Sequence, residues 1–170
     1  AIIKGVTFGD VVYHQIEVNR SKNVFVEDCL FIGNTESSRV QIDIGSAGQK
    51  SATPTATIME NIWFENCRFA SRDATSQNIG VPRMIELDHS SNISWKNVGF
   101  NKCEFGAVYN TSSSYVGYTM ALDGTSLLYG EGLTITNCKF YGDAHGQTSA
   151  IHLIPGSGIL RGVRIENNYF

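Results

Sequence analysis

The chain has 170 residues, a formal net charge of −3 and 17% charged residues, a size that fits one domain over residues 1–170. No run or face rich in lysine and arginine is present, which argues against a nucleic-acid partner. No apolar run is long enough to span a bilayer, so we expect no membrane insertion.

A nine-residue pattern recurs along the chain. It consists of a small residue or asparagine, an aliphatic residue, any residue, an apolar residue, two polar residues, cysteine, any residue and an aromatic residue. Clear copies are residues 23–31, 61–69, 97–105 and 132–140, and weaker copies are residues 5–13 and 162–170. The alternation of apolar and polar positions predicts β-strands, and the two polar residues predict a bend before the cysteine. Repetition every few tens of residues indicates a solenoid, array or propeller.

A shorter apolar–any–apolar element lies between these copies. It occurs at residues 16–18, 42–44, 85–87, 120–122 and 151–153. Each copy predicts a strand with one face inward and one outward. Helical spacing, a leucine-rich frame and four-stranded blades are all missing from the pattern. We therefore predict an all-β fold, a right-handed parallel β-helix of about five to six coils. The pattern begins and ends inside copies, so we expect a fragment of a longer chain, or ends capped by other domains or subunits.

All four cysteines fall on one repeat position, at Cys29, Cys67, Cys103 and Cys138. Equivalent positions in a β-helix stack about 4.8 Å apart, which predicts a column of buried thiols acting as small apolar groups. Disulfides between neighbours would require the thiols to tilt toward each other, and a straight column cannot make the tetrahedron that zinc prefers. A second predicted column, of stacked aromatic residues, contains Tyr13, Phe31, Phe69, Phe105, Phe140 and Phe170.

Three polar segments leave the predicted coil at the same place, just before the short strand. They are residues 71–82, 106–118 and 141–149, and we expect them to wall a groove. The second contains Tyr109, Tyr115 and Tyr118 among serine, threonine and glycine. Such a composition suits a sugar site and a subunit interface equally well.

Carboxylates gather on the outward face of the predicted short strands. One predicted column contains Glu17, Asp43, Glu86, Ala121 and His152. A second, two residues further along each strand, contains Asn19, Gly45, Asp88, Asp123 and Ile154. A purely structural wall would tend to avoid like charges across paired strands. Clustered carboxyls can instead supply a general acid beside an ionised partner.

The same cluster allows other interpretations. Its oxygens could bind a hard cation such as calcium, or the charges could only keep a sheet face soluble. Neighbouring coils place carboxyls near the spacing of retaining glycosidases, and diagonal pairs place them near that of inverting ones. Arg39 and Arg83 could pair with the acids or hold an anionic substrate, and His89 and His152 could assist. No P-loop, dinucleotide fingerprint or metal-binding histidine pair is present, so we predict no cofactor and no metal.

Three runs in the first half resemble a known family. They are His-Gln-Ile-Glu-Val at 14–18, Ser-Lys-Asn-Val-Phe-Val-Glu-Asp-Cys at 21–29 and Val-Gln-Ile-Asp at 40–43. They resemble pectate-lyase-like β-helix proteins, above all those in the tailspikes and appendages of tailed phages that attack host surface glycans. The resemblance implies a homotrimer on a virion tail that cleaves or grips capsule, O-antigen or teichoic acid with outward carboxylates. The paired-Asp and Gly-His-Gly motifs of polygalacturonases are missing, which argues against pectin.

We therefore expect a glycoside hydrolase that depolymerises a bacterial surface polysaccharide. The predicted catalytic residues are Asp43, Glu86, Asp88 and Asp123. The predicted substrate-binding residues are Glu17, Gln41, Arg39, Arg83, His89, Tyr109, Tyr115, Tyr118 and His152. The alternatives are a non-catalytic receptor-binding fibre or adhesin shaft, a polysaccharide lyase with an arginine or lysine base, and a secreted bacterial protein in place of a virion component.

Overall fold

The computed structural model of the chain describes residues 1–9, 14–19, 21–32, 40–44, 57–70, 83–87, 93–106, 120–125, 129–141, 150–154 and 159–170. Within these ranges all regular structure is β-strand and no helix occurs. Accordingly, this part of the chain has no helix with the length and apolar character needed to cross a membrane.

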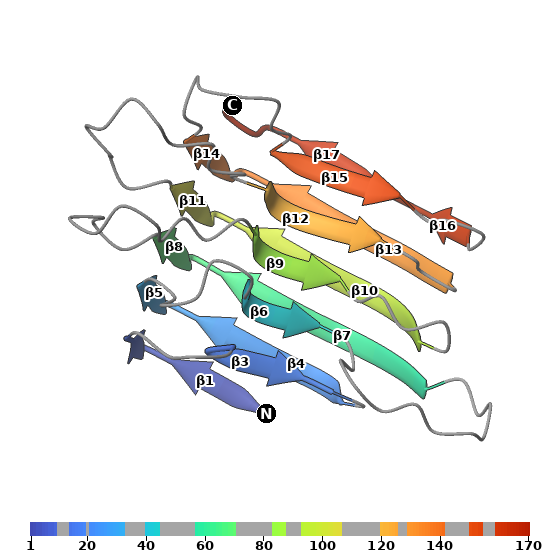
Figure 1. Cartoon of the computed structure of the whole chain (residues 1–170), viewed down its shortest axis with the longest axis horizontal. Helices are drawn as coiled ribbons and strands as arrows, with labels where there is room; N and C mark the ends of the chain where they lie inside the picture. The colour runs from blue at the N-terminus through green and yellow to red at the C-terminus, as the bar shows by residue number, and fades with distance from the viewer. Residues whose placement is uncertain are drawn as a thin grey trace.

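The strands form three parallel sheets, here named A, B and C (Figure 1). Sheet A contains β1 (Ile2–Lys4), β4 (Lys22–Glu27), β7 (Thr57–Glu65), β10 (Ile93–Asn101), β13 (Tyr129–Thr136) and β16 (Ile159–Arg161), and β17 (Arg164–Glu166) also pairs with β13. Sheet B contains β2 (Thr7–Phe8), β5 (Leu30–Ile32), β8 (Arg68–Ala70), β11 (Glu104–Gly106) and β14 (Lys139–Tyr141). Sheet C contains β3 (Ile16–Val18), β6 (Val40–Ile44), β9 (Arg83–Leu87), β12 (Met120–Thr125) and β15 (Ile151–Ile154).

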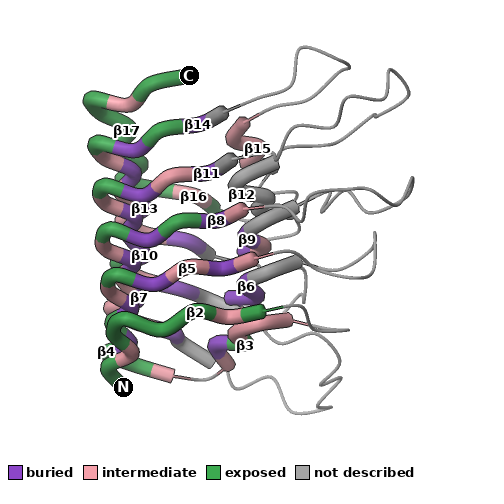
Figure 2. The backbone as a smooth tube through the Cα atoms, turned by 90° about the vertical axis from the view of Figure 1, so that its left-hand side faces the viewer, coloured by how far each residue is buried: buried purple, intermediate pink, exposed green. Residues whose placement is uncertain are grey.

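The chain passes through sheets A, B and C in turn and returns to sheet A one strand further along (Figures 1 and 2). Each strand therefore pairs with its equivalents in the preceding and following repeats, and every pairing is parallel. The all-β prediction is confirmed for the described residues, and parallel strands stacked in this way are the arrangement of a β-helix-like solenoid.

Left-handed backbone conformations explain two features of the repeat. The residue before each cysteine position has positive φ, which confirms the predicted bend between sheets A and B. These residues are Gly5, Asp28, Asn66, Lys102, Asn137 and Asn167. The first residue of the pattern also has positive φ, and the backbone pairing between strands of sheet A skips this position. These residues are Asn23, Asn61, Asn97, Gly132 and Gly162. Asparagine and glycine recur at the start of the pattern because they tolerate this conformation better than other residues do.

The register corrects the predicted first copy. Phe8 is the partner of Phe31 and Lys4 the partner of Glu27, so Val6 takes the cysteine position and the copy ends at Phe8 rather than at Tyr13. Gly5 therefore takes the bend position rather than the start of the pattern. A glycine fits both left-handed positions, so its identity could not distinguish them. Tyr13 lies outside the described residues.

Aromatic rings fill the interior as one continuous stack. Neighbouring ring centroids are 4.8 to 4.9 Å apart and the planes are within 8° of parallel, in the order Phe8, Phe31, Phe69, Phe105, Phe140 and Phe170. A second pair, Phe64 and Phe100, stacks beside it and meets it edge-on. The predicted aromatic column is confirmed from Phe31 onward. The buried residues of all three sheets face this interior (Figure 2).

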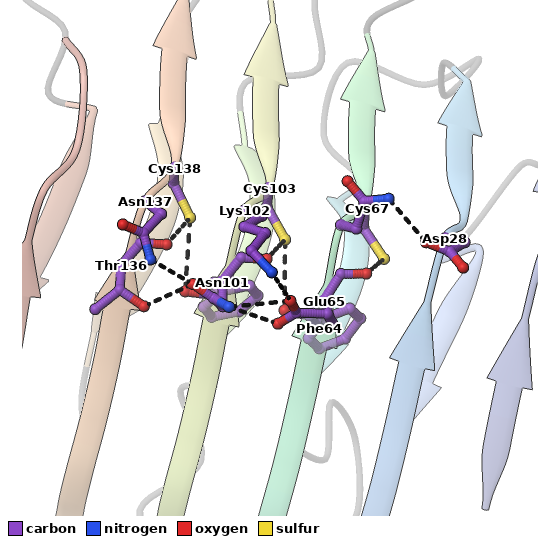
Figure 3. Close-up of polar contacts among 12 residues, drawn as sticks. Asp28, Phe64, Glu65, Cys67, Asn101, Lys102, Cys103, Thr136, Asn137 and Cys138 are labelled. Carbon is purple, nitrogen blue, oxygen red and sulfur yellow. Dashed lines mark hydrogen bonds and ion pairs between the residues drawn. The ribbon is translucent and has the colours of Figure 1, made fainter.

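The four thiols are buried and free, which confirms the predicted thiol column. The Sγ of Cys67, Cys103 and Cys138 each donates to a carbonyl oxygen of the preceding repeat at 3.5 Å. Figure 3 shows this contact between Cys103 and Phe64. Burial raises the pKa of Cys103 well above its ordinary value. Hydrogen bonding with Cys103 lowers the pKa of Cys67 and of Cys138.

Asn168 takes the cysteine position in the last copy, as predicted, and reproduces this hydrogen bonding with an amide. Its Nδ2 donates to the carbonyl of Ile135 at 2.9 Å, and its Oδ1 accepts from the backbone N–H of Cys138 at 2.8 Å. From Cys67 onward each described residue at this position therefore bonds a carbonyl of the preceding repeat, and a metal-ligating role is not needed to explain the cysteines.

Candidate functional site

The described strands of sheet C carry a continuous row of acidic positions. Backbone pairing places Glu17 beside Asp43, Asp43 beside Glu86, and Glu86 beside Asp123, with His152 next in line. Equivalent residues of neighbouring strands lie about 4.8 Å apart at the backbone. We call these five residues the acidic column.

The acidic column corrects the predicted alignment of the fourth short strand. The prediction placed Ala121 beside Glu86 and put Asp123 in a separate column. Leu122 is instead the partner of Ile85, which brings Asp123 directly beside Glu86. The run Met-Ala-Leu-Asp-Gly contains two apolar anchors, Met120 and Leu122, so the alternation pattern fits two frames that differ by two residues. Backbone pairing with β9 selects the second frame.

Asp43 is buried, although it was predicted to face solvent. Its exposed fraction is 2%, and its strand neighbours Ile42 and Ile44 are fully buried in the core. Its Oδ2 lies 3.6 Å from Nε2 of His14, whose side chain is 14% exposed. This contact becomes an ion pair when His14 is protonated. Because a buried carboxylate is costly without a partner, His14 helps to explain how Asp43 is tolerated.

Sequence reasoning did not assign a role to His14 or to its neighbour Gln15. The Nε2 of Gln15 donates to the carbonyls of Phe8 at 3.2 Å, Gly9 at 2.8 Å and Ile32 at 3.0 Å. These bonds fasten the chain where it passes from sheet B to sheet C, and so they position the backbone that carries His14. The sequence feature that could have indicated these roles is a pair of hydrogen-bonding residues directly before a short strand.

The other members of the acidic column differ in exposure. Glu17 is exposed, while Glu86 and His152 are half-buried. Only the backbone of Asp123 is described, and it places this residue in register with Glu86. A ligand approaching sheet C from outside can therefore reach Glu17 and Glu86 more easily than Asp43.

Charged side chains on sheets A and B follow a different pattern from those on sheet C. On sheet A the register produces an alternating row of Lys22, Glu60, Lys96, Glu131 and Arg161. Within it, Nζ of Lys22 lies 3.0 Å from Glu60 and Nζ of Lys96 lies 3.3 Å from Glu131. On sheet B, Glu104 lies between Arg68 at 3.8 Å and Lys139 at 3.2 Å. Opposite charges thus alternate along these two rows, although a second row of sheet A pairs Glu27 with Glu65, whereas the acidic column places four acids in succession.

The remaining predicted residues fall into two groups. Gln41 and Arg83 lie in β6 and β9, where only their backbone is described, and Arg83 is the register partner of Val40 and Met120. The others lie outside the described residues, namely Arg39, Asp88, His89, Tyr109, Tyr115 and Tyr118. Nearly all of the three predicted groove-walling segments lie outside them too.

Comparison with known proteins yields no relative. No protein-family model matches the chain, and neither a curated protein nor a solved structure matches it. Among the described residues, no group of three or more histidine, cysteine, aspartate or glutamate side chains is placed to hold a metal ion. The fold defines the chain as an all-β solenoid of parallel strands, and the acidic column is its candidate functional site.

Proposed function

We propose that the chain is part of a right-handed parallel β-helix that binds and hydrolyses a bacterial surface polysaccharide at the outer face of sheet C. The observation that carries this proposal is the acidic column. Like charges on directly paired strands destabilise a sheet, and the chain alternates charges along one row of sheet A and along sheet B, whereas the column places four acids in succession. A function that needs several carboxyls together accounts for the exception.

The proposed right-handed winding follows the strong preference of parallel crossover connections. The proposed longer chain, homotrimer and place on a phage tail follow from the resemblance of residues 14–18, 21–29 and 40–43 to tailspike β-helices. Capsule, O-antigen and teichoic acid are the substrate classes that this resemblance suggests.

The column supports a division of roles between its acids. Glu86 is half-buried and lies between two other acidic positions of the column, so it is the best placed general acid. Asp43 is buried with its Oδ2 3.6 Å from Nε2 of His14, so this histidine can position the carboxyl group. Asp123 adjoins Glu86 on the other side and is the candidate second carboxylate.

The distance between two carboxyls of the acidic column bears on whether hydrolysis retains or inverts the configuration at the anomeric carbon. Residues on adjacent strands, such as Glu86 and Asp123, are about 4.8 Å apart at the backbone and suit a retaining mechanism, in which carboxyls are roughly 5 Å apart. Glu17 and Glu86 are two strands apart, about 9.6 Å at the backbone, and suit an inverting one. Following the anomeric form of the first product by NMR distinguishes the two.

The deciding experiment is a turnover assay of the full chain on purified capsule, O-antigen and teichoic acid preparations. New reducing ends that vanish in Glu86→Gln and persist in Glu104→Gln support hydrolysis at sheet C. The control variant removes a paired carboxylate from sheet B. New reducing ends together with unsaturated-uronate absorbance would instead indicate a lyase.

A non-catalytic binding shaft is the second candidate, and one observation favours it. Asp43 is only 2% exposed, so this central member of the column cannot touch a substrate without a rearrangement of its surroundings. Glycan retained by the protein without any new ends would select this alternative.

A further inference from the structure

The outer face of sheet A carries a narrow apolar strip, well separated in the fold from the acidic column. The register places Ile2, Phe25, Trp63 and Gly99 side by side on successive strands. Phe25 is 43% exposed and Ile2 is 78% exposed, while Trp63 is half-buried. We call these four residues the sheet A strip.

Gly99 makes room for the indole of Trp63. A Cβ at Gly99 would overlap Cζ3 and Cε3 of Trp63, so the six-membered ring covers this glycine on the neighbouring strand. The aromatic surface of Trp63 therefore extends over two rungs of the stack. Together with Phe25 it makes a continuous apolar surface along the direction of stacking.

Hydrogen-bonding side chains border the strip on both sides. Two residues earlier on each strand, Asn61 donates to Asn23 at 2.9 Å and Asn97 donates to Asn61 at 3.1 Å. Two residues later, Asn101 donates to Oε2 of Glu65 at 2.8 Å, part of the polar row in Figure 3. The amides of Asn23, Asn61 and Asn97 keep further donor or acceptor capacity for a ligand, and on the other side the carboxylate of Glu65 can accept a further hydrogen bond.

The charges that border the strip are already neutralised within the chain. Lys4 lies 3.0 Å from Glu27, and Lys102 lies 3.1 Å from Glu65. On the other side, Lys22 pairs with Glu60 at 3.0 Å. These ion pairs neutralise charge on both sides of the strip, and a neutral ligand complements such a surface best.

The shape of the strip favours a linear ligand over a folded protein. A stable protein interface buries about 800 Å² on each partner around a broad apolar centre, whereas this strip is one side chain wide. A pyranose ring has apolar C–H faces, which stack on aromatic planes, and hydroxyl groups at its edges, which bond amides and carboxylates. One sugar unit is comparable in length to one rung of the stack, about 4.8 Å.

We propose that the sheet A strip binds a neutral polysaccharide chain, which lies along the stack with one sugar ring on Phe25 and another on Trp63. The ring hydroxyls bond the Asn23–Asn61–Asn97 row on one side and the Glu65–Asn101 row on the other. This binding site is separate from sheet C and does not depend on hydrolysis there.

The test is a titration of the full chain with three neutral hexasaccharides: cellohexaose, maltohexaose and chitohexaose. The chain has two tryptophans, and Trp95 is fully buried, so a change in tryptophan fluorescence reports on Trp63. We expect saturable binding of at least one hexamer, confirmed by calorimetry. Phe25→Ala and Trp63→Ala should each weaken it roughly 10-fold or more, the order expected for loss of a stacking plane.

Two further variants make the test specific. Gly99→Ala keeps both aromatic residues but displaces the indole, so it should also weaken binding. Glu86→Gln on sheet C should bind the hexamers as the unmodified chain does, which separates this proposal from the proposed hydrolysis. Phe25 is exposed, so Phe25→Ala is expected to fold even if Trp63→Ala does not.

Three results would overturn the proposal. The first is the absence of saturable binding for all three hexamers, and the second is binding that survives both Phe25→Ala and Trp63→Ala. The third is self-association in sedimentation velocity that Trp63→Ala abolishes, because the strip would then be covered by a second copy of the chain.

Discussion

The outer faces of sheets A and C have the same backbone architecture but opposite charge patterns. On sheet A, Lys22 faces Glu60 and Lys96 faces Glu131, so each charge has an opposite neighbour. On sheet C, Asp43 lies between Glu17 and Glu86 in register, and its observed cationic contact is His14, which comes from outside the column. Stacking of identical strands therefore does not force like charges together. On sheet A the two acids that do pair in register, Glu27 and Glu65, each have a lysine nearby, at 3.0 and 3.1 Å. The acidic column instead places four acids in succession, which makes it the feature in need of a functional explanation.

The largest expected effect is a loss of turnover when an acid of sheet C, but not one of sheet A, is replaced. Glu86→Gln should lower turnover of the responsive polysaccharide by ~100-fold or more, because it removes the proposed general acid. Its free energy of unfolding should be unchanged or slightly higher, since repulsion within the column is relieved. Reducing-end assays and urea denaturation measure both quantities.

Glu60→Gln is the matched change on sheet A. It should leave turnover intact and lower the free energy of unfolding by about 0.2–1 kcal/mol, because a surface ion pair is lost. Equal losses of turnover in the two variants would contradict the special role of sheet C.

A second prediction concerns the contact that stabilises the acidic column. His14→Gln should lower the free energy of unfolding by about 1–3 kcal/mol, because it removes a partner of a buried carboxylate. Adding Asp43→Asn should recover part of this loss, since the uncompensated charge is then gone. A double variant less stable than His14→Gln would show that Asp43 is held by other groups instead.

A third prediction concerns the thiol column, which is buried in the interior of the fold. The pKa of Cys103 is raised by burial, so the folded chain resists its ionisation while the unfolded chain does not. The contribution of Cys103 is fully present below the unfolded pKa of about 8.5 and is lost as pH rises toward the folded pKa, at up to ~1.4 kcal/mol per pH unit.

Cys103→Val should therefore flatten the fall in stability above about pH 8.5. Valine is the matched replacement because Val6 occupies the same position in the first copy. Urea denaturation at pH 7 to 10 tests this, and identical slopes for both chains would refute the assignment.

The smallest expected effect lies at the bend between sheets A and B. Lys102 adopts φ of 52°, a conformation that disfavours lysine and suits asparagine. Lys102→Asn should raise the free energy of unfolding by about 0.5 kcal/mol, even after the exposed contact with Glu65 is lost. Asn66→Lys, at the equivalent position one repeat earlier, should change stability in the opposite direction. A thermal shift of the same sign in both variants would contradict this account.

The sequence by itself determined the parts of the fold that depend on local pattern. Period-2 alternation defined the strands, the polar pair before Cys29 and its equivalents defined the bend, and the spacing from cysteine to phenylalanine defined two interior columns. These features follow from backbone sterics and from the burial of apolar side chains, so they can be recognised separately in each copy of the repeat.

Only the tertiary structure decided which positions lie side by side and how deeply they are buried. The frame of Met120–Thr125 remained ambiguous by two residues, and pairing with β9 brought Asp123 beside Glu86. Pairing with β5 likewise put Phe8 into the aromatic stack in place of Tyr13. Two further contacts join residues far apart in the sequence. Asp43 is buried against His14, 29 positions away, and the indole of Trp63 covers Gly99, 36 positions away. A short alternating strand satisfies its own pattern in more than one register, and only hydrogen bonding to both neighbouring strands selects one.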